Sequence, residues 1–511
     1  MIAPTNPNLQ DIMKKNFLTF VLFLLAMAAT AKGIDLFPRN NAVGVNVDTR
    51  LVLHFDKQPT VGNSGWVRVF DLTTGHAVDS LNISLPSGPT EPQPRLASAV
   101  YTPVPYSYSP RRATNRDTRP GTASGVNKPD SGRYQLNIIG GFIDGFHFHP
   151  ILVRGNKAVV YLHNNVLEYG HRYAVTIDKE AILVPGTKFK GIRKGEWTFT
   201  VKVQEPNPGD RKLVVSADGT ADFSTVQGAM DRVPDNITDA SKAWTVEVKN
   251  GDYEEIVYFR NKQYVNLKGE SRDGVVVHYA NNEIFNPHPL DIKTNEWPGT
   301  FPSRRAAFAI DNCRYISVSD MTIKTDLQGQ AEGLLVNGSH NTFNNVHVVG
   351  SGDALQTNGS AHYIGCTVDG GGDTVLGRGP AFFERCTLRS RGAFMWIRNT
   401  NANHGDVFVD CTFEGTADDV ELARSPINKG TGYPYAEAVL INCKLKNIAP
   451  CGWRSIEGDT TYVHFWEYNS RDFFGHPVDT SRRHPVSRQL DGEKDKALIE
   501  SYSSRQYVLG W

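Results

Sequence analysis

The stretch YIGCTVDGGGDTVLG, residues 363–377, is one copy of a pattern that recurs through the second half of this 511-residue chain. Related copies share a short apolar or aromatic segment followed by an alternating run. These segments close at residues 320, 345, 366, 386, 411 and 443, at intervals of 25, 21, 20, 25 and 32 residues. Repeats of this length, rich in β-branched and alternating residues, predict a solenoid of short strands.

Two acidic residues occupy the same place in consecutive copies of this repeat. Asp353 lies eight residues after Asn345, and Asp373 lies seven residues after Cys366. Equivalent positions of a parallel β-solenoid lie one strand spacing apart, about 4.8 Å, so we expect the two carboxylates to stack. Adjacent carboxylates do not ionise together easily, so one should keep a proton near neutral pH. This pairing suits acid/base and nucleophilic chemistry.

The cysteines follow the same period. All six lie after residue 312, and four of them, Cys366, Cys386, Cys411 and Cys443, take the same place in consecutive repeats. A stack of inward thiols in the solenoid core fits this spacing better than disulfide pairing does. The sequence leaves the state of Cys313 and Cys451 open.

Composition is that of a globular protein with many turns, because 46 residues are glycine and 40% are hydrophobic. The net charge is zero, so it gives no indication of a nucleic-acid partner. We expect no nucleic-acid binding, no cofactor, no metal and a monomer. His147 and His149 alternate on one predicted strand and could bind a metal, but packing between domains is the better interpretation.

The N-terminus has the features of an export signal. Lys14 and Lys15 precede an apolar run at residues 17–29, and small residues follow at 29–31. We predict a cleavable signal peptide over residues 1–31, with Met13 a more natural start than Met1, and therefore a secreted or periplasmic protein. The run is too short for a comfortable membrane span. A buried core segment is the alternative.

Short alternating strands fill residues 34–204, which predicts a β-sandwich. A Pro- and Arg-rich insertion at 86–130 interrupts it, and 204–210 has the composition of a linker. The whole chain is therefore expected to be all-β, with a sandwich first and the solenoid over residues 211–511. One amphipathic helix at about 223–233, capped by Asp222 or Ser224, should cover the open end of the solenoid.

A series of motifs resembles those of pectin methylesterases in order along the second domain. The matching stretches are 215–227, 251–257, 267–271, 330–336, 350–355, 370–377, 422–426, 448–453 and 465–469. The sandwich domain resembles the immunoglobulin-like modules that precede secreted bacterial enzymes. The first resemblance implies a right-handed parallel β-helix, an aspartyl esterase that needs no metal, and pectin or a homogalacturonan-type polysaccharide as substrate.

The resemblance also implies a role for each matching residue. Asp373 matches the nucleophile that attacks the C6 carbonyl of a methyl-esterified galacturonate, and Asp353 matches the general acid/base. Gln330 matches an oxyanion donor. Arg424 matches the arginine that holds the nucleophile charged and oriented, and that lowers its pKa. Pairing of Arg424 with a nearby acid such as Glu421 is the structural alternative.

Departures from the motifs leave alternatives open. Gly352 stands where the family has a second oxyanion glutamine, a loss that typically costs about 100–1,000-fold in rate. Pro426 stands near the place of a groove tryptophan, so Tyr433, Tyr435 and Trp453 are candidates to line a rebuilt substrate platform. The chain could instead be a weakened or inactive pectin-binding protein, or an esterase for another uronate ester. A lyase would need an acidic calcium cluster, which the sequence does not offer near the two aspartates.

Overall fold

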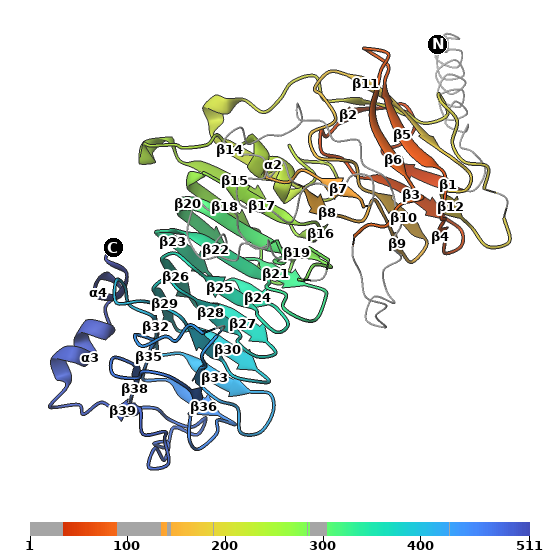
Figure 1. Cartoon of the computed structure of the whole chain (residues 1–511). Coiled ribbons are helices and arrows are strands. Elements are labelled where there is room, and N and C mark those ends of the chain that lie inside the picture. Colours follow the sequence, from red (N-terminus) through yellow and green to blue (C-terminus); the bar gives the residue numbers. More distant parts are fainter. Residues whose placement is uncertain are drawn as a thin grey trace, which may run out of the picture.

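The structure, a computed structural model, describes residues 34–88, 134–140, 145–187, 189–283, 285–286, 304–428 and 430–511 (Figure 1). The predicted signal peptide lies outside these residues, and so does the predicted insertion from residue 89 onward. Within the described ranges, no helix is both long enough and apolar enough to cross a membrane.

The N-terminal part of the chain is a β-sandwich whose two sheets enclose one hydrophobic core. One sheet has the order β1 (Ile34–Phe37), β3 (Leu51–Phe55), β10 (Lys157–Val160) and β9 (Ile151–Arg154), and the other β2 (Ala42–Val45), β13 (Thr198–Val201), β11 (Arg172–Ile177), β5 (Trp66–Asp71) and β6 (Ala77–Asn82). Two further pairs are β12 (Ile182–Leu183) with β4 (Thr60–Val61), and β7 (Leu136–Asn137) with β8 (Phe146–His147). Buried and partly exposed residues alternate along β5, as expected for a strand with one face on the core. We call this part the module; its immunoglobulin-like character stays a prediction.

Residues from Lys212 onward form a parallel β-helix, seen in Figure 1 as the stack of strands from green to blue. Most coils contribute a strand to each of three columns. The first column is β14 (Lys212–Val215), β15 (Trp244–Val248), β18 (Gln263–Gly269), β20 (Phe308–Ser319), β23 (Asn341–Asn344), β26 (Ala361–Ile364), β29 (Ala381–Glu384), β32 (Asp406–Val409), β35 (Glu437–Ile441), β38 (His464–Tyr468) and β39 (Ser487–Gln489).

The second and third columns complete each coil. The second is β17 (Val257–Arg260), the start of β20, β22 (Leu334–Ser339), β25 (Leu355–Thr357), β28 (Val375–Gly377), β31 (Met395–Ile397), β34 (Ala423–Ser425) and β37 (Trp453–Ile456). The third is β16 (Gly251–Glu254), β19 (Val275–Tyr279), β21 (Thr322–Thr325), β24 (His347–Val349), β27 (Thr367–Gly370), β30 (Thr387–Ser390), β33 (Thr412–Gly415) and β36 (Lys444–Lys446). The solenoid predicted from the repeat is confirmed.

Stacks of identical or similar side chains fill the interior of the β-helix. The rings of Phe343, Tyr363, Phe383 and Phe408 stack with centroid separations of 5.0, 4.6 and 4.5 Å. The four repeat cysteines are buried and free, and each thiol donates to a carbonyl of the coil before it, as Cys386 does to Tyr363 at 3.4 Å. The predicted inward thiol stack is therefore confirmed, and Cys313 and Cys451 are free as well.

A helix covers the first coil of the β-helix. α2 (Val226–Arg232) lies there with Val226, Ala229 and Met230 buried, as predicted. Its cap is Thr225, whose hydroxyl accepts from the amide of Gly228, and not Asp222 or Ser224. Near the C-terminus, α3 (Lys496–Tyr502) and α4 (Arg505–Leu509) pack on the outer face of the first column. The short 3₁₀ turns are η3 (Pro208–Asp210), in the predicted linker, and η4 (Ala240–Lys242).

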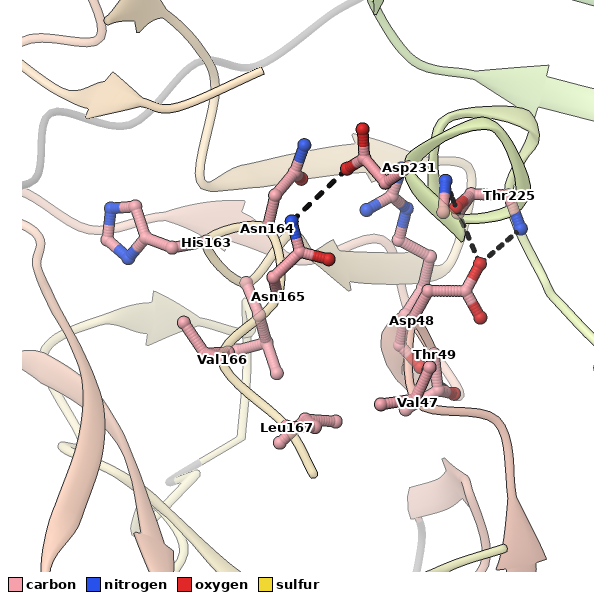
Figure 2. A pocket seen from close by; sticks show the side chains of 13 residues that line it. Val47, Asp48, Thr49, His163, Asn164, Asn165, Val166, Leu167, Thr225 and Asp231 are labelled. Atoms are coloured by element: carbon pink, nitrogen blue, oxygen red, sulfur yellow. Dashed lines mark hydrogen bonds between the residues drawn. The ribbon is translucent and has the colours of Figure 1, made fainter. Parts of the chain in front are cut away.

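The module contacts the end of the β-helix that α2 covers. Asp48 accepts a hydrogen bond from the amide of Ser224 at 2.9 Å. Figure 2 shows its bond from the amide of Thr225 (2.8 Å) and the bond that the Asn165 amide donates to Asp231 (3.1 Å). His147 and His149 also lie at this junction. The Nδ1 atom of His147 is 2.8 Å from the carbonyl oxygen of Phe285, and the ring of His149 stacks on Phe285 at 4.4 Å. Their predicted role in packing is confirmed.

Candidate active site

Asp353 and Asp373 hold equivalent positions in neighbouring coils. Each lies in the turn that leads from the third column to the second, two residues before the paired residues Leu355 and Val375. Both side chains are nearly buried, since Asp353 is 7% and Asp373 8% exposed. The predicted stacking of the two coils is therefore confirmed.

One guanidinium makes a bidentate contact with the carboxylate of Asp373. The Nε atom of Arg424 donates to Oδ1 of Asp373 at 2.6 Å, and Nη2 donates to Oδ2. This bidentate contact fixes the orientation of the carboxylate. Asp373 also has a φ angle of 46°, a left-handed conformation that non-glycine residues adopt rarely and that often marks functional sites. The alternative partner, Glu421, pairs with Arg454 at 3.2 Å instead.

Asp353 belongs to a different charge cluster, centred on the buried Arg305. The Nη2 atom of Arg305 donates to Asp353 at 2.8 Å and to Glu332 at 2.6 Å, and its Nε donates to Glu332 at 2.8 Å. Arg305 is 4% exposed and Glu332 is fully buried. One guanidinium thus contacts two carboxyl groups.

Protonation of Asp353 follows from this environment. Burial raises the pKa of Asp353 to about 7; Arg305 opposes this rise, and the charges of Glu332 and Asp373 add to it. A carboxyl group with a pKa near 7 can both give and take a proton at neutral pH. The expectation that Asp353 keeps the proton of the pair is therefore supported.

Gln330 lies on the exposed rim of the same cluster. Its side-chain oxygen accepts from Nη1 of Arg305 at 2.6 Å. An arginine can only donate, so the oxygen of the amide must face it and the NH₂ group must point away. The NH₂ of Gln330 is thereby oriented as a donor.

Gly352 has no room for the second glutamine of the family. A Cβ atom there would lie 2.7 Å from the carbonyl oxygen of Gly329, which also accepts a 2.7 Å hydrogen bond from the Gly352 amide. The hydroxyl oxygen of Ser351 accepts from the Gly329 amide at 3.2 Å, which leaves its O–H group able to donate. Gln330, backed by Arg305, and Ser351 are therefore the side-chain donors that the described residues offer at this corner.

The aromatic residues around the pair differ from those predicted. Trp453 is fully buried, and its ring stacks on Phe465 at 4.8 Å inside the β-helix, so its prediction as a substrate residue is wrong. Tyr433 is only 6% exposed and packs in the core, so it is also unsuited to stack on a sugar. Tyr435 is partly exposed and stacks on Tyr462 at 5.0 Å.

Trp396 is the aromatic side chain beside Arg424, the partner of Asp373. It is the register partner of Arg424 on β31, and its ring lies between the guanidinium groups of Arg424 (4.9 Å) and Arg398 (4.7 Å). Such cation–π contacts hold an indole in one orientation. The sequence analysis missed Trp396, although the repeat register could have placed it one coil beyond Leu376 and next to Arg424.

Arg305 and Glu332 were missed as well. Glu332 stands two residues after Gln330, where the family motif has an apolar residue, and this replacement is a detectable signal. Arg305 lies outside the repeat pattern and carries no comparable signal. It reaches the site because the chain after β19 returns to the start of β20 beside the acid pair.

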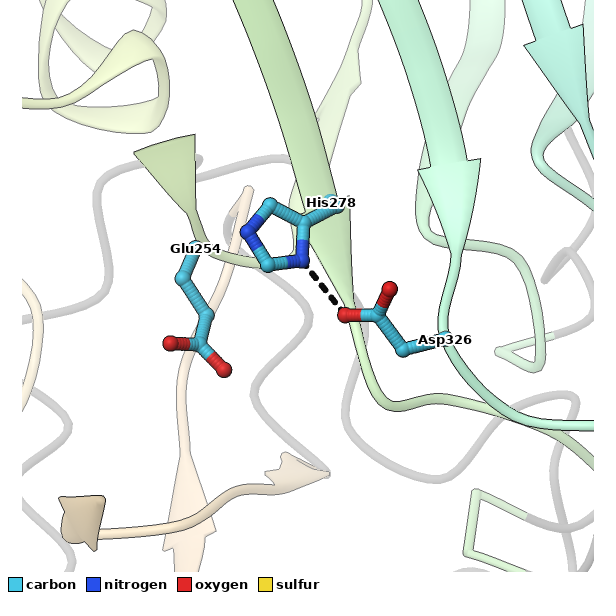
Figure 3. A group of neighbouring side chains, drawn as sticks. All are labelled: Glu254, His278 and Asp326. Atoms are coloured by element: carbon cyan, nitrogen blue, oxygen red, sulfur yellow. Dashed lines mark hydrogen bonds and ion pairs between the residues drawn. The ribbon is translucent and has the colours of Figure 1, made fainter. Parts of the chain in front are cut away.

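A second group of acidic and histidine side chains, Glu254, His278 and Asp326, lies on the third column (Figure 3). Both ring nitrogens of His278 are engaged, Nδ1 with Asp326 and Nε2 with Asp252 at 2.8 Å. Burial lowers the pKa of His278, but hydrogen bonds to Asp252 and Asp326 outweigh it and raise the pKa to about 10. A protonated imidazole with two bonded N–H groups has no lone pair for a metal, so this group is an ion-pair cluster.

A family model and curated relatives identify one family for the second domain. The model of the pectinesterase family matches residues 212–510. The Arabidopsis thaliana pectinesterase QRT1 is 28% identical over 321 residues, 59% of this chain and 78% of that protein; putative pectinesterase 11 from the same plant is 24% identical, with 56% and 76% covered. The structure of pectin methylesterase from carrot covers 58% of this chain and 92% of its own, with a TM-score of 0.47 and 18% identity.

Proposed function

This chain belongs to the pectinesterase family, and we propose that it hydrolyses the methyl esters of pectin-type galacturonan through an aspartyl intermediate. The products are methanol and free uronate groups. In this proposal Asp373 is the nucleophile and Asp353 is the general acid and then the general base. Gln330 is the oxyanion donor and Arg424 orients the nucleophile.

The first half of the reaction forms an acyl-enzyme. The Asp373 carboxylate attacks the C6 carbonyl of the ester, and negative charge develops on the carbonyl oxygen, where the NH₂ group of Gln330 can stabilise it. The bond to the methoxy oxygen then breaks as Asp353 transfers its proton to that oxygen. Methanol leaves, and the sugar is joined to Asp373 as a mixed anhydride.

The second half restores the enzyme. Asp353, now ionised, takes a proton from a water molecule whose oxygen attacks the anhydride carbonyl. The bond to Asp373 breaks, the uronic acid leaves and loses its proton to solvent, and both aspartates regain their starting protonation states. No metal or cofactor is needed to balance these steps.

One observation carries the proposal, namely that the two aspartates share a register position but have different partners. Asp373 alone receives the two-pronged contact of Arg424, while the buried Asp353 has its pKa raised to about 7. Paired carboxylates whose environments separate their protonation states are the usual basis for a nucleophile and an acid in one site.

Methanol release from methylated pectin by the intact chain and by Asp373→Ala tests the proposal. We expect release by the wild type and none above background by the variant. Pectin binding without any release, unaffected by Asp373→Ala, would instead support the alternative of a binding protein. That alternative is favoured by the single observation that Gly352 leaves no space for a second glutamine.

Export is part of the same proposal. The segment at residues 1–31 has the charge and apolar pattern of a signal peptide, and export would bring the enzyme to a cell-wall polymer. Detection of the mature protein outside the cytoplasm, beginning after residue 31, would test it.

A further inference from the structure

The side chains of the second column that face away from the core form one row past the acid pair. From the first coil onward, the register partners in this row are Tyr258, Ala309, Leu335, Gln356, Leu376, Trp396, Arg424 and Arg454. Exposure changes along it. Tyr258, Ala309 and Leu335 are completely buried and Gln356 and Leu376 are 2% exposed, whereas the side chains of Arg424 and Arg454 are 37% and 47% exposed.

The module covers the beginning of this row. The ring of Phe146, on β8, packs against Tyr258 with centroids 4.7 Å apart, and Phe146 is fully buried. At Gly140 a Cβ atom would lie only 2.2 Å from the carbonyl oxygen of Tyr258, so the module backbone lies directly on the row there. In Figure 1 the hairpin β7–β8 lies beside the first coils.

The chain that follows β19 extends this cover toward the acid pair. Phe285 stacks on His149 of the module, and the Asn282 side chain donates to the carbonyl of Gln328 at 2.9 Å. The amide of Glu283 donates to the carbonyl of Gln330 at 3.1 Å. The cover therefore continues from the module to the coil of the oxyanion residue.

Two consecutive arginines join the cover to the catalytic machinery. Arg304 donates to the carbonyl of Gly145 at 2.9 Å and lies 5.3 Å from the ring centroid of Phe146. Its neighbour Arg305 donates to the carboxylate of Asp353 at 2.8 Å. We call Phe146, Phe285, Arg304 and Arg305 the wall. The wall thus ends in direct contact with the general acid.

We propose that this wall restricts hydrolysis to esters at the ends of uronate chains and to short oligomers. The inference rests on the proposed function and adds the substrate class. The wall contacts Asp353 itself, so it leaves little room for sugars beyond the reacting ester on that side. The rest of the chain extends over Trp396, Arg424 and Arg454, where cations and an indole face acidic sugar rings.

A length series of substrates tests the proposal with the intact protein. Fully methyl-esterified oligogalacturonides of increasing length and a high-methyl pectin are digested to completion, and methanol and the position of each free acid are measured. We expect the methanol yield per ester to fall in inverse proportion to chain length, with the free acids at one chain end. Removal of most internal esters of the polymer would contradict the proposed restriction to chain ends, while the proposed function would still hold. Absence of methanol from every substrate would overturn the proposed function itself.

A pair of variants tests the wall directly. Phe146→Ala removes the ring that seats the module on the row, and Phe474→Ala, at a side chain that is 87% exposed near the C-terminus, is the matched control. We expect Phe146→Ala to increase the share of polymer esters that are cleaved, and Phe474→Ala to leave it unchanged. If Phe146→Ala is not folded, the length series with the wild type decides alone. An unchanged cleavage pattern in a folded Phe146→Ala protein would contradict the role given to the module.

Discussion

The coils of Asp353 and Asp373 share one register and differ in the charged side chains around each aspartate. Both aspartates precede paired strands at the same register position and are almost equally buried. Asp373 has Arg424 to itself, whereas Asp353 shares Arg305 with the buried Glu332. Repeating coils therefore present two carboxyl groups in register, and the side chains on either flank give each of them a different ion-pair partner.

The two flanks also differ in access. On the side of Asp353, Arg305 is continuous with residues that contact the module. On the side of Asp373, Trp396, Arg424 and Arg454 form a row that opens toward solvent. The surroundings of Asp353 and Asp373 thus differ both in charge partners and in exposure to solvent. Variants on one side or the other can test each difference separately.

Replacement of the nucleophile should have the largest effect. Asp373→Asn keeps the shape of the side chain but removes the attacking carboxylate, so kcat for methanol release should fall by about 10⁴-fold or more. Asp369→Asn, four residues earlier in the same coil, is the control, because Asp369 pairs with His347 on the third column. Substantial residual turnover by Asp373→Asn would mean that Asp353 or another group attacks the ester.

Replacement of the general acid should cost less, and its cost should depend on the leaving group. Asp353→Asn cannot protonate methanol or activate water, so the rate on methyl esters should fall by about 10²–10⁴-fold. With an aryl ester of the same uronate, whose leaving group needs no proton, the first turnover should recover while later turnovers stay slow. Stopped-flow release of the phenolate should therefore show a burst. An equal loss of rate on the methyl and aryl esters, without a burst, would contradict the separate roles proposed for the two aspartates.

The repeat made this part of the site predictable from sequence. A fixed period places residues 20 apart one above the other, so the stacking of Asp353 and Asp373 needed no knowledge of the tertiary structure. Arg424 was found through the order of family motifs. Arg305 could not be found in this way, because its contact with Asp353 depends on how a non-repeating segment folds back across the coils.

The errors at Trp453 and Tyr433 have a physical cause. Successive residues of a strand face opposite sides, so a shift of one position exchanges core and surface. Trp453 is the register partner of Ala423 in the inward row, and its neighbour Arg454 is the partner of Arg424 in the outward row. The order of the family motifs locates the strand β37, but only its exact register decides which of its residues faces the substrate and which faces the core.

The cluster around Arg305 should set the alkaline side of the pH profile. Asp353 must be protonated to release methanol, so kcat/KM should fall as pH rises through its pKa of about 7. Arg305 favours the ionised form, so Arg305→Met should raise this pKa and move the fall to higher pH. Glu332 disfavours the ionised form, so Glu332→Gln should move it to lower pH. Each shift should be about one pH unit, which corresponds to about 1.4 kcal/mol.

Opposite shifts of the alkaline fall in kcat/KM would show that Arg305 and Glu332 act through their charges. Loss of packing alone lowers the rate but does not move the pH of this fall in a direction set by the charge removed. Glu414→Gln is the matched control, since it removes the same charge from an exposed pair with Lys446 on the third column. Shifts of Arg305→Met and Glu332→Gln in the same direction would contradict the shared-cation arrangement.

The smallest effect is expected at Trp396, on the open side of the pair. The indole contacts Arg424 and lies where the sugar chain should leave the site, so Trp396→Ala should raise KM by about tenfold, within the 1–2 kcal/mol of a partly desolvated cation–π and stacking contact. kcat should change less, because Asp373 keeps both bonds from Arg424. Trp396→Phe retains a ring at this position and should restore most of the affinity. If Trp396→Ala instead lowers kcat with KM unchanged, the indole acts by holding Arg424 against the nucleophile, and the sugar must leave the site by another path.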